Sequence, residues 1–108
     1  MVMSTEKLPT SKQWRNLVLL ALADTGEANN VNGAVRVVDQ GAFDNGWPSG
    51  VNRNVYGALA AAGLAEEAWI DRGRDTWCRI TAEGRSVVTA DAGRFRKAAK
   101  DLRRKARG

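Results

Sequence analysis

The feature that most constrains this chain is residues 49–85, where patterns for a helix, two strands and a second helix follow one another closely. Apolar side chains recur at a spacing of three and four over residues 51–62, which predicts a helix with one buried face. Ser49 suits the start of this helix, because its hydroxyl can accept from a free amide of the first turn. Gly63 suits its end, since glycine readily adopts the left-handed conformation. Thr81 is expected to cap the second helix.

A β-hairpin is predicted between these two helices. Residues 68–71 and 76–80 carry Trp, Ile, Thr and Cys, which favour strands, on either side of a polar turn. Arg72 and Arg74 lie at the tip of this turn. We therefore expect a strand pair that presents two arginines to solvent.

The hairpin has two apolar faces in its predicted register. Pairing across the turn sets Ile70 opposite Trp77 and Trp69 opposite Cys78. Trp69, Cys78 and Ile80 are expected to face the core. Ile70 and Trp77 lie on the other face and are too large to remain fully in water, so they are predicted to pack on the N-terminal segment or on a second subunit. Stacking of Trp77 on DNA is a less favoured option.

The run AGLAEE, followed by the hairpin and by RITAEGR, resembles the second half of winged helix-turn-helix domains of the MarR and PadR type. It is also similar to the N-terminal DNA-binding domain of Mrr-type restriction proteins, and that likeness extends upstream to FDNGWPSGVNRNVYGAL. The resemblance covers roughly a third of the chain. It implies a winged-helix fold that binds DNA and carries no catalytic residues.

The N-terminal part predicts a central helix. Residues 1–9 are expected to form a flexible lead-in, and Thr10 or Ser11 to cap a helix over residues 12–24 that ends at Gly26. This helix is apolar nearly all round, so it should lie in the middle of the domain. Its longest apolar run is far below the ~20 residues needed to cross a bilayer.

Residues 33–43 lie in the part of the chain whose sequence gives the weakest secondary-structure signal. A helix with its valines turned inward is favoured there, because the winged-helix pattern expects one, although residues 34–38 also have strand character. Residues 42–50, with two glycines and a proline, predict a loop. The fold class predicted is mainly α with a small β-hairpin: a winged helix-turn-helix domain over residues 10–90.

The C-terminal residues 91–108 predict a basic extension of the last helix. Val88, Phe95 and Leu102 are seven residues apart and form a narrow apolar stripe. An unbroken helix over residues 82–107 would be about 39 Å long and would outreach its own domain. Part of the helix is therefore expected to contact a partner, and the stripe to pack on the second copy of a homodimer or on the parent domain.

The charge of the chain is unevenly distributed. Residues 1–90 hold 9 Lys and Arg against 10 Asp and Glu, and residues 91–108 hold 8 against 2, so −1 and +6 give the net charge of +5. The predicted winged-helix domain is thus close to neutral, and the C-terminal segment is strongly basic. This segment is expected to attract nucleic acid non-specifically.

The predicted DNA contacts lie in three places. Early in the helix of residues 51–62, side chains are placed to meet base edges, although asparagines there also suit caps and solvent: Asn52, Arg53, Asn54 and Tyr56. At the hairpin tip, Arg72 and Arg74 are expected to contact phosphates. The basic C-terminal segment supplies further contacts: Arg94, Lys97, Lys100, Arg103 and Arg104.

Enzymatic chemistry finds little support. The chain has no histidine and one cysteine, so the commonest general base and metal ligand are missing, and neither a cofactor nor a metal is expected. With no signal peptide visible, a reduced, cytoplasmic protein is expected. The sequence predicts a sequence-specific binder of double-stranded DNA, such as a small transcriptional regulator. One alternative is a protein-interaction adaptor or inhibitor that uses Ile70, Trp77 and an Ala-rich stripe. Another is RNA binding by the basic C-terminal segment alone.

Overall fold

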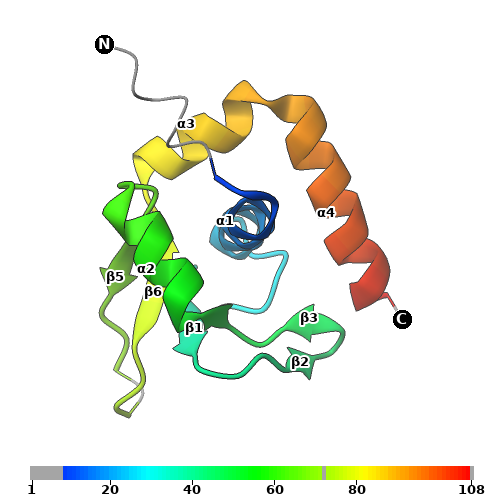
Figure 1. Ribbon diagram of the computed structural model, residues 1–108. Coiled ribbons are helices and arrows are strands. Elements are labelled where there is room, and N and C mark those ends of the chain that lie inside the picture. Colours follow the sequence, from blue (N-terminus) through cyan, green and yellow to red (C-terminus); the bar gives the residue numbers. More distant parts are fainter. Residues whose placement is uncertain (1–8, 72, 108) are drawn as a thin grey trace.

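The chain winds around one helix, α1 (Ser11–Asp24), in the computed structural model, which describes residues 9–71 and 73–107. Figure 1 shows α1 in the middle, with the three other helices and the strands arranged around it. Thr10 caps α1 by accepting from the backbone N–H of Gln13, whose side chain in turn accepts from the N–H of Thr10. The predicted helix and its cap are confirmed.

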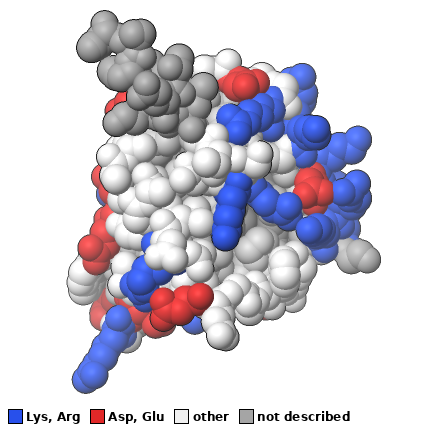
Figure 2. All heavy atoms as spheres, in the orientation of Figure 1, with Lys and Arg blue, Asp and Glu red and all other residues white. Residues whose placement is uncertain are grey.

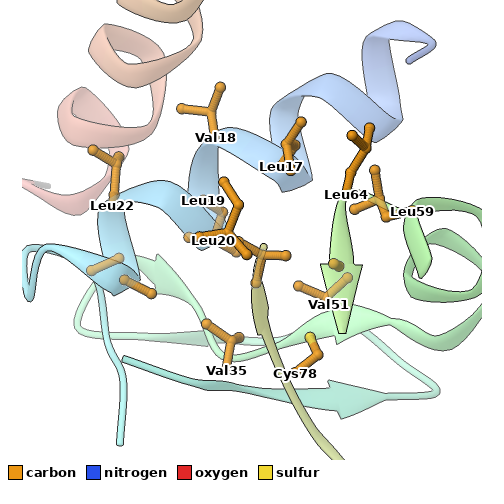
Figure 3. Packing of buried hydrophobic residues seen from close by; sticks show 14 of the residues in the cluster. Leu17, Val18, Leu19, Leu20, Leu22, Val35, Val51, Leu59, Leu64 and Cys78 are labelled. Carbon is orange, nitrogen blue, oxygen red and sulfur yellow. The ribbon is translucent and has the colours of Figure 1, made fainter. Parts of the chain in front are cut away.

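The core is built on α1 because this helix is apolar nearly all round. Leu17, Val18 and Leu20 are fully buried, and Leu19 and Leu22 are each 2% exposed. These side chains meet residues from the strands and from the other helices (Figure 3). The predicted central position of this helix is therefore confirmed, and it explains why a chain of this length can bury a single large core.

A mixed four-stranded sheet covers one side of α1. Its strands, in spatial order, are β4 (Val51–Asn52), β1 (Val35–Val38), β6 (Trp77–Ile80) and β5 (Ala65–Ala68). β1 runs parallel to β4 and antiparallel to β6, and β5 is antiparallel to β6. A separate two-stranded hairpin consists of β2 (Phe43–Asp44) and β3 (Trp47–Pro48).

The prediction of a helix over residues 33–43 is wrong, because strands β1 and β2 occupy this region. Asn32 and Gly33 have φ angles of 54° and 83°, in the left-handed region, which prevents a helix from starting there. Val35 and Val37 are buried while Arg36 between them is exposed, the alternation of a strand. Residues 35–38 form a strand because they pair with β4 and β6, and neither of these strands is next to them in sequence.

The helix predicted after Ser49 is present as α2 (Arg53–Ala61). Its cap is Asn52 and not Ser49, because Val51 and Asn52 first pair with β1 as strand β4. The Asn52 side chain accepts from the N–H of Asn54 at 2.9 Å. Gly63, with a φ of 80°, lies just beyond the helix end as predicted.

The predicted register of the β5–β6 hairpin is wrong by two residues. Cys78 pairs with Glu67 and not with Trp69, and Trp77 pairs with Ala68 and not with Ile70. The strand begins at buried Ala65, earlier than predicted, and Ala65 pairs with Ile80.

The predicted core position of Trp69 is wrong, whereas Trp77 is covered as expected. Trp69 lies beyond the strand and is 83% exposed, whereas Trp77 is only 7% exposed and Ile70 is half-buried. Trp77 and Ile70 form a small second cluster with Ala34 and Ala68. Cys78 and Ile80 do face the main core, as predicted.

The predicted continuous C-terminal helix is broken into α3 (Ala82–Ala90) and α4 (Ala92–Ala106). Asp91, with φ −123° and ψ 74°, leaves the helical conformation, and its side chain accepts from the N–H of Arg94 to start α4. The break turns α4 back along α1 (Figure 1). Leu102 and Val88, predicted to contact a partner, are 1% and 5% exposed in the core of the same chain.

The described residues therefore form a compact α/β domain of four helices, a mixed sheet and a short hairpin. The predicted fold was mainly α with one hairpin, and it lacked the strands that the structure has over residues 35–52. The predicted lead-in lies outside the described residues except for Pro9. Among the described helices, none is both long and apolar enough to cross a membrane.

Candidate nucleic-acid interface

α4 separates its apolar side chains from its charged ones. Ala99 and Leu102 face α1 and the core, while Arg96, Lys97 and Lys100 are exposed. Figure 2 shows Lys and Arg gathered over the α4 side of the molecule. The periodicity that predicted an amphipathic helix is confirmed, and its apolar stripe is covered by α1.

A groove of about 610 Å³ lies between α1 and α4. Five cations line it, one from α1 and four from α4: Arg15, Arg94, Lys97, Lys100 and Arg104. Asp101 is the one acidic residue among the lining residues. The tertiary structure thus adds Arg15 to four of the C-terminal cations that the sequence predicted for nucleic-acid contact.

Asp101 connects the two walls of this groove. Its Oδ2 accepts from Nη1 of Arg15 at 2.9 Å, and its Oδ1 accepts from Nη2 of Arg104. Asp101 is partly buried, with 32% of its side chain exposed, whereas 71% of Arg104 is exposed. A single carboxylate therefore holds two guanidinium groups close together, one on each helix.

Arg94 closes one end of the groove. Its guanidinium carbon lies 4.4 Å from the ring centroid of Trp14, and its Nη2 donates to the carbonyl of Pro9 at 3.0 Å. The indole N–H of Trp14 donates to the carbonyl of Arg94 at 3.1 Å. These contacts fasten the first turn of α4 to the start of α1 and hold the cation in place.

Arg103 lies outside the groove, on a different side of α4. Its Nη2 donates to Oε1 of Glu27 at 2.8 Å in a two-bond ion pair. The hydrogen bond from Arg103 lowers the pKa of Glu27 below its ordinary value, and the same bond raises the pKa of Arg103. Whatever stability this pair contributes is present above the ordinary glutamate pKa and is lost as the pH falls below it.

The residues predicted to contact bases lie in or next to α2, and they carry little positive charge that is not already paired within the chain. Arg53 forms an ion pair with Asp39, with Nε and Oδ1 2.8 Å apart. Asn52 is used as the helix cap, and Asn54 is exposed. Tyr56 packs against the core, where burial raises the pKa of its hydroxyl.

The loop between β5 and β6 has no net charge, because it holds two arginines and two aspartates. Arg74 is exposed and has no ion pair within the described part of the chain. Asp75 lies 3.5 Å from Nε of Arg36, whose guanidinium sits 5.5 Å from the centroid of the Trp77 ring. The predicted contact at Arg72 lies outside the described residues.

The structure divides the predicted site residues between two surfaces. Those on α2 and on the β5–β6 loop lie on one side of α1, and those on α4 lie on the other (Figure 1). The sequence could not reveal that Arg15 joins the second group, because the pairing of α1 with α4 joins residues 86 positions apart.

The lone cysteine offers no reactive site. Cys78 is fully buried, and burial raises the pKa of its thiol to about 12. Within residues 9–71 and 73–107, no group of three His, Cys, Asp or Glu side chains is placed to hold a metal ion.

We expect a thiol reagent such as iodoacetamide to leave native Cys78 unmodified at pH 8 and to label it fast in urea, because the thiolate is the reactive form and the thiol is enclosed. Mass spectrometry after timed exposure measures the modification. Labelling of the native chain at the rate seen in urea would contradict the buried position.

Five cations line the α1–α4 groove, and Asp101 lies among them. Comparisons of the chain with protein-family models, with curated protein sequences and with solved structures found no match.

Proposed function

We propose that this protein binds double-stranded DNA, with α4 and the adjoining end of α1 against the phosphate backbone. The observation that carries the proposal is the groove where five cations meet around one carboxylate. Cations on two packed helices keep their spacing, which favours contact with a regular row of phosphates. α4 is part of the folded core, so these charges are held on a rigid element rather than on a loose tail.

A further part of the proposal is sequence readout by α2 and action as a small transcriptional regulator, which a partial likeness in element order to a winged helix supports. Helix α1, strand β1, helix α2 and the hairpin β5–β6 follow in the order of that fold, and β1, β6 and β5 are antiparallel neighbours. The β2–β3 hairpin and β4 stand where a middle helix would be. Asn54 and Arg53 would read bases once Arg53 leaves Asp39.

The proposed complex needs no homodimer. Val88 and Leu102, predicted for the dimer interface, are already covered by the chain's own core, and Phe95 is half-buried against it. DNA binding by one copy of the chain is therefore the simpler proposal.

Two matched sets of substitutions test which surface binds DNA. The variant with Lys97→Ala, Lys100→Ala and Arg104→Ala should weaken binding to a mixed-sequence duplex, and the slope of log K against log salt should fall by about 0.9 for each phosphate contact removed. All three positions lie on α4 and are exposed, so alanine should preserve the helix. Fluorescence anisotropy over a salt series measures both effects.

The control variant carries Arg53→Ala and Arg74→Ala on the other surface. It should retain most of the affinity for random duplexes and lose preference only among sequences. If the intact chain shows no salt-dependent affinity for duplex DNA, the proposed function is wrong.

A protein adaptor is the second candidate, and the exposed Trp69 favours it. This side chain is 83% exposed beside half-buried Ile70, on the surface where Arg53 is already paired with Asp39. Large exposed aromatic side chains are common anchors of protein interfaces. An adaptor would show no duplex affinity to lose, and Trp69→Ser would abolish its complex with the partner.

A further inference from the structure

Resting on the proposed DNA binding, we infer that the α1–α4 groove is a preorganised phosphate clamp, in which Asp101 is a positioning residue for Arg15 and Arg104. The ligand group is one phosphodiester of a nucleic-acid strand, held between an arginine of α1 and an arginine of α4. The clamp differs from a general positive surface, because its affinity depends on where the two guanidinium groups are held.

The hydrogen bonds of Asp101 carry this inference. Each of its carboxylate oxygens accepts from a different arginine, Oδ2 from Arg15 and Oδ1 from Arg104. A guanidinium has five N–H donors in a fixed plane. Each arginine thus keeps donors free for a phosphate, and the planar fork of arginine matches the geometry of phosphate oxygens.

The surrounding charges explain why a carboxylate belongs in a site for an anion. Arg15 and Arg104 share the groove with Lys97, Lys100 and Arg94, so without Asp101 the cations would repel one another and spread apart. Asp101 reduces the net charge of the lining residues but fixes two flexible side chains before the ligand arrives. Preorganisation of this kind raises affinity because the ordering is complete before binding.

The length of the cationic row indicates the ligand class. Arg94 and Arg104 are ten positions apart on one helix, which corresponds to about 15 Å at 1.5 Å per residue. Successive phosphates of one DNA strand advance ~3.4 Å along the duplex axis. The row is several times longer than this step and can therefore meet more than one phosphate of a strand, a chemistry shared by duplex and single-stranded DNA.

The decisive comparison is between Asp101→Asn and Glu27→Gln. Both substitutions remove one negative charge, and both remove the carboxylate partner of an arginine on α4, but Glu27 lies outside the groove. Binding of the full chain is measured by anisotropy with a labelled mixed-sequence duplex and with the matching single strand. Circular dichroism and thermal melts verify that each variant is folded.

The clamp predicts opposite results for the two variants. Asp101→Asn should weaken binding by about tenfold, the effect of roughly one charge-assisted hydrogen bond, although the chain becomes more positive. Glu27→Gln should bind as well as the unmodified chain or better. Arg15→Lys, which keeps the charge and removes the fork, should also weaken binding, and it tests the clamp even if Asp101→Asn does not fold.

The outcomes separate failure of the clamp from failure of the function. Salt-dependent binding that Asp101→Asn leaves unchanged or tightens, with Arg15→Lys equal to the unmodified chain, would overturn the clamp and leave DNA binding standing. Absence of binding by the unmodified chain would overturn both. Weakening by Asp101→Asn with both oligonucleotides supports a site for a single strand, and weakening with the duplex alone supports a site for one strand of a duplex.

Discussion

Replacing Leu102 by alanine is expected to lower the free energy of unfolding by about 2–5 kcal/mol. Leu102 is 1% exposed, and it belongs to the main core cluster together with Trp14, Leu22 and Val88. Truncation removes buried methyl groups and leaves a cavity between α4 and α1 that rigid neighbours cannot fill. Urea denaturation followed by circular dichroism measures the change.

The matched control is Arg96→Ala, an exposed position on the same helix, which should change stability by less than about 0.5 kcal/mol. Sedimentation at several concentrations gives a second measurement. A Leu102→Ala variant with unchanged stability but a lost dimer would show that this side chain packs on a second copy and not on α1.

The second large effect is expected at Gly84. A Cβ added there would lie 2.3 Å from the carbonyl oxygen of Leu64 and 2.7 Å from Cγ1 of Ile80, closer than van der Waals contact allows. Gly84→Ala must therefore displace the start of α3 from the turn before β5 and from β6, at a cost of about 1–3 kcal/mol. Thermal melts at one protein concentration measure the effect.

The same substitution at Gly93 should have the opposite sign. Gly93 lies in helix α4, and a Cβ there would meet nothing within 4 Å. Alanine loses less backbone entropy on folding than glycine, so Gly93→Ala should stabilise the chain by up to about 1 kcal/mol. Equal effects of the two substitutions would contradict the close packing at Gly84.

Elements governed by neighbouring residues could be predicted from the sequence. α1 has an apolar run and a capping box within a single turn, and α2 has an apolar face and a terminal glycine. The signals for these helices lie within the helix itself, because a helix forms its hydrogen bonds between residues four positions apart. The amphipathic pattern of the C-terminal helix could also be predicted, because it lies within the helix itself.

Elements that depend on pairing with distant residues could not be predicted from the sequence. β1 forms where a helix was predicted, because Val37 pairs with Val51 and Val35 with Cys78, a residue far along the chain. The register of the β5–β6 hairpin depends on pairing with a distant strand, and the strand ends before Trp69, which is 83% exposed although it was expected to face the core.

The candidate site shows the same division. The cations of α4 are visible in the composition of residues 91–108, and four of them line the groove. Arg15 gives no signal of its own, since it is one of several polar or charged residues in the first turns of a helix that supplies much of the core. Asp101 is inconspicuous in sequence, and its role appears only when its two oxygens meet arginines of different helices.

By itself, the sequence determined the helices α1 and α2, the uneven charge and the absence of histidine chemistry, because these depend on local spacing or on composition alone. Only the tertiary structure decided that Asp91 breaks the last helix and that α4 returns along α1. That packing buries the apolar stripe predicted for a partner and assembles the groove from residues far apart in the chain. The physical reason is that burial of Leu102 and Ala99 against α1 depends on the whole core, which no short segment of sequence contains.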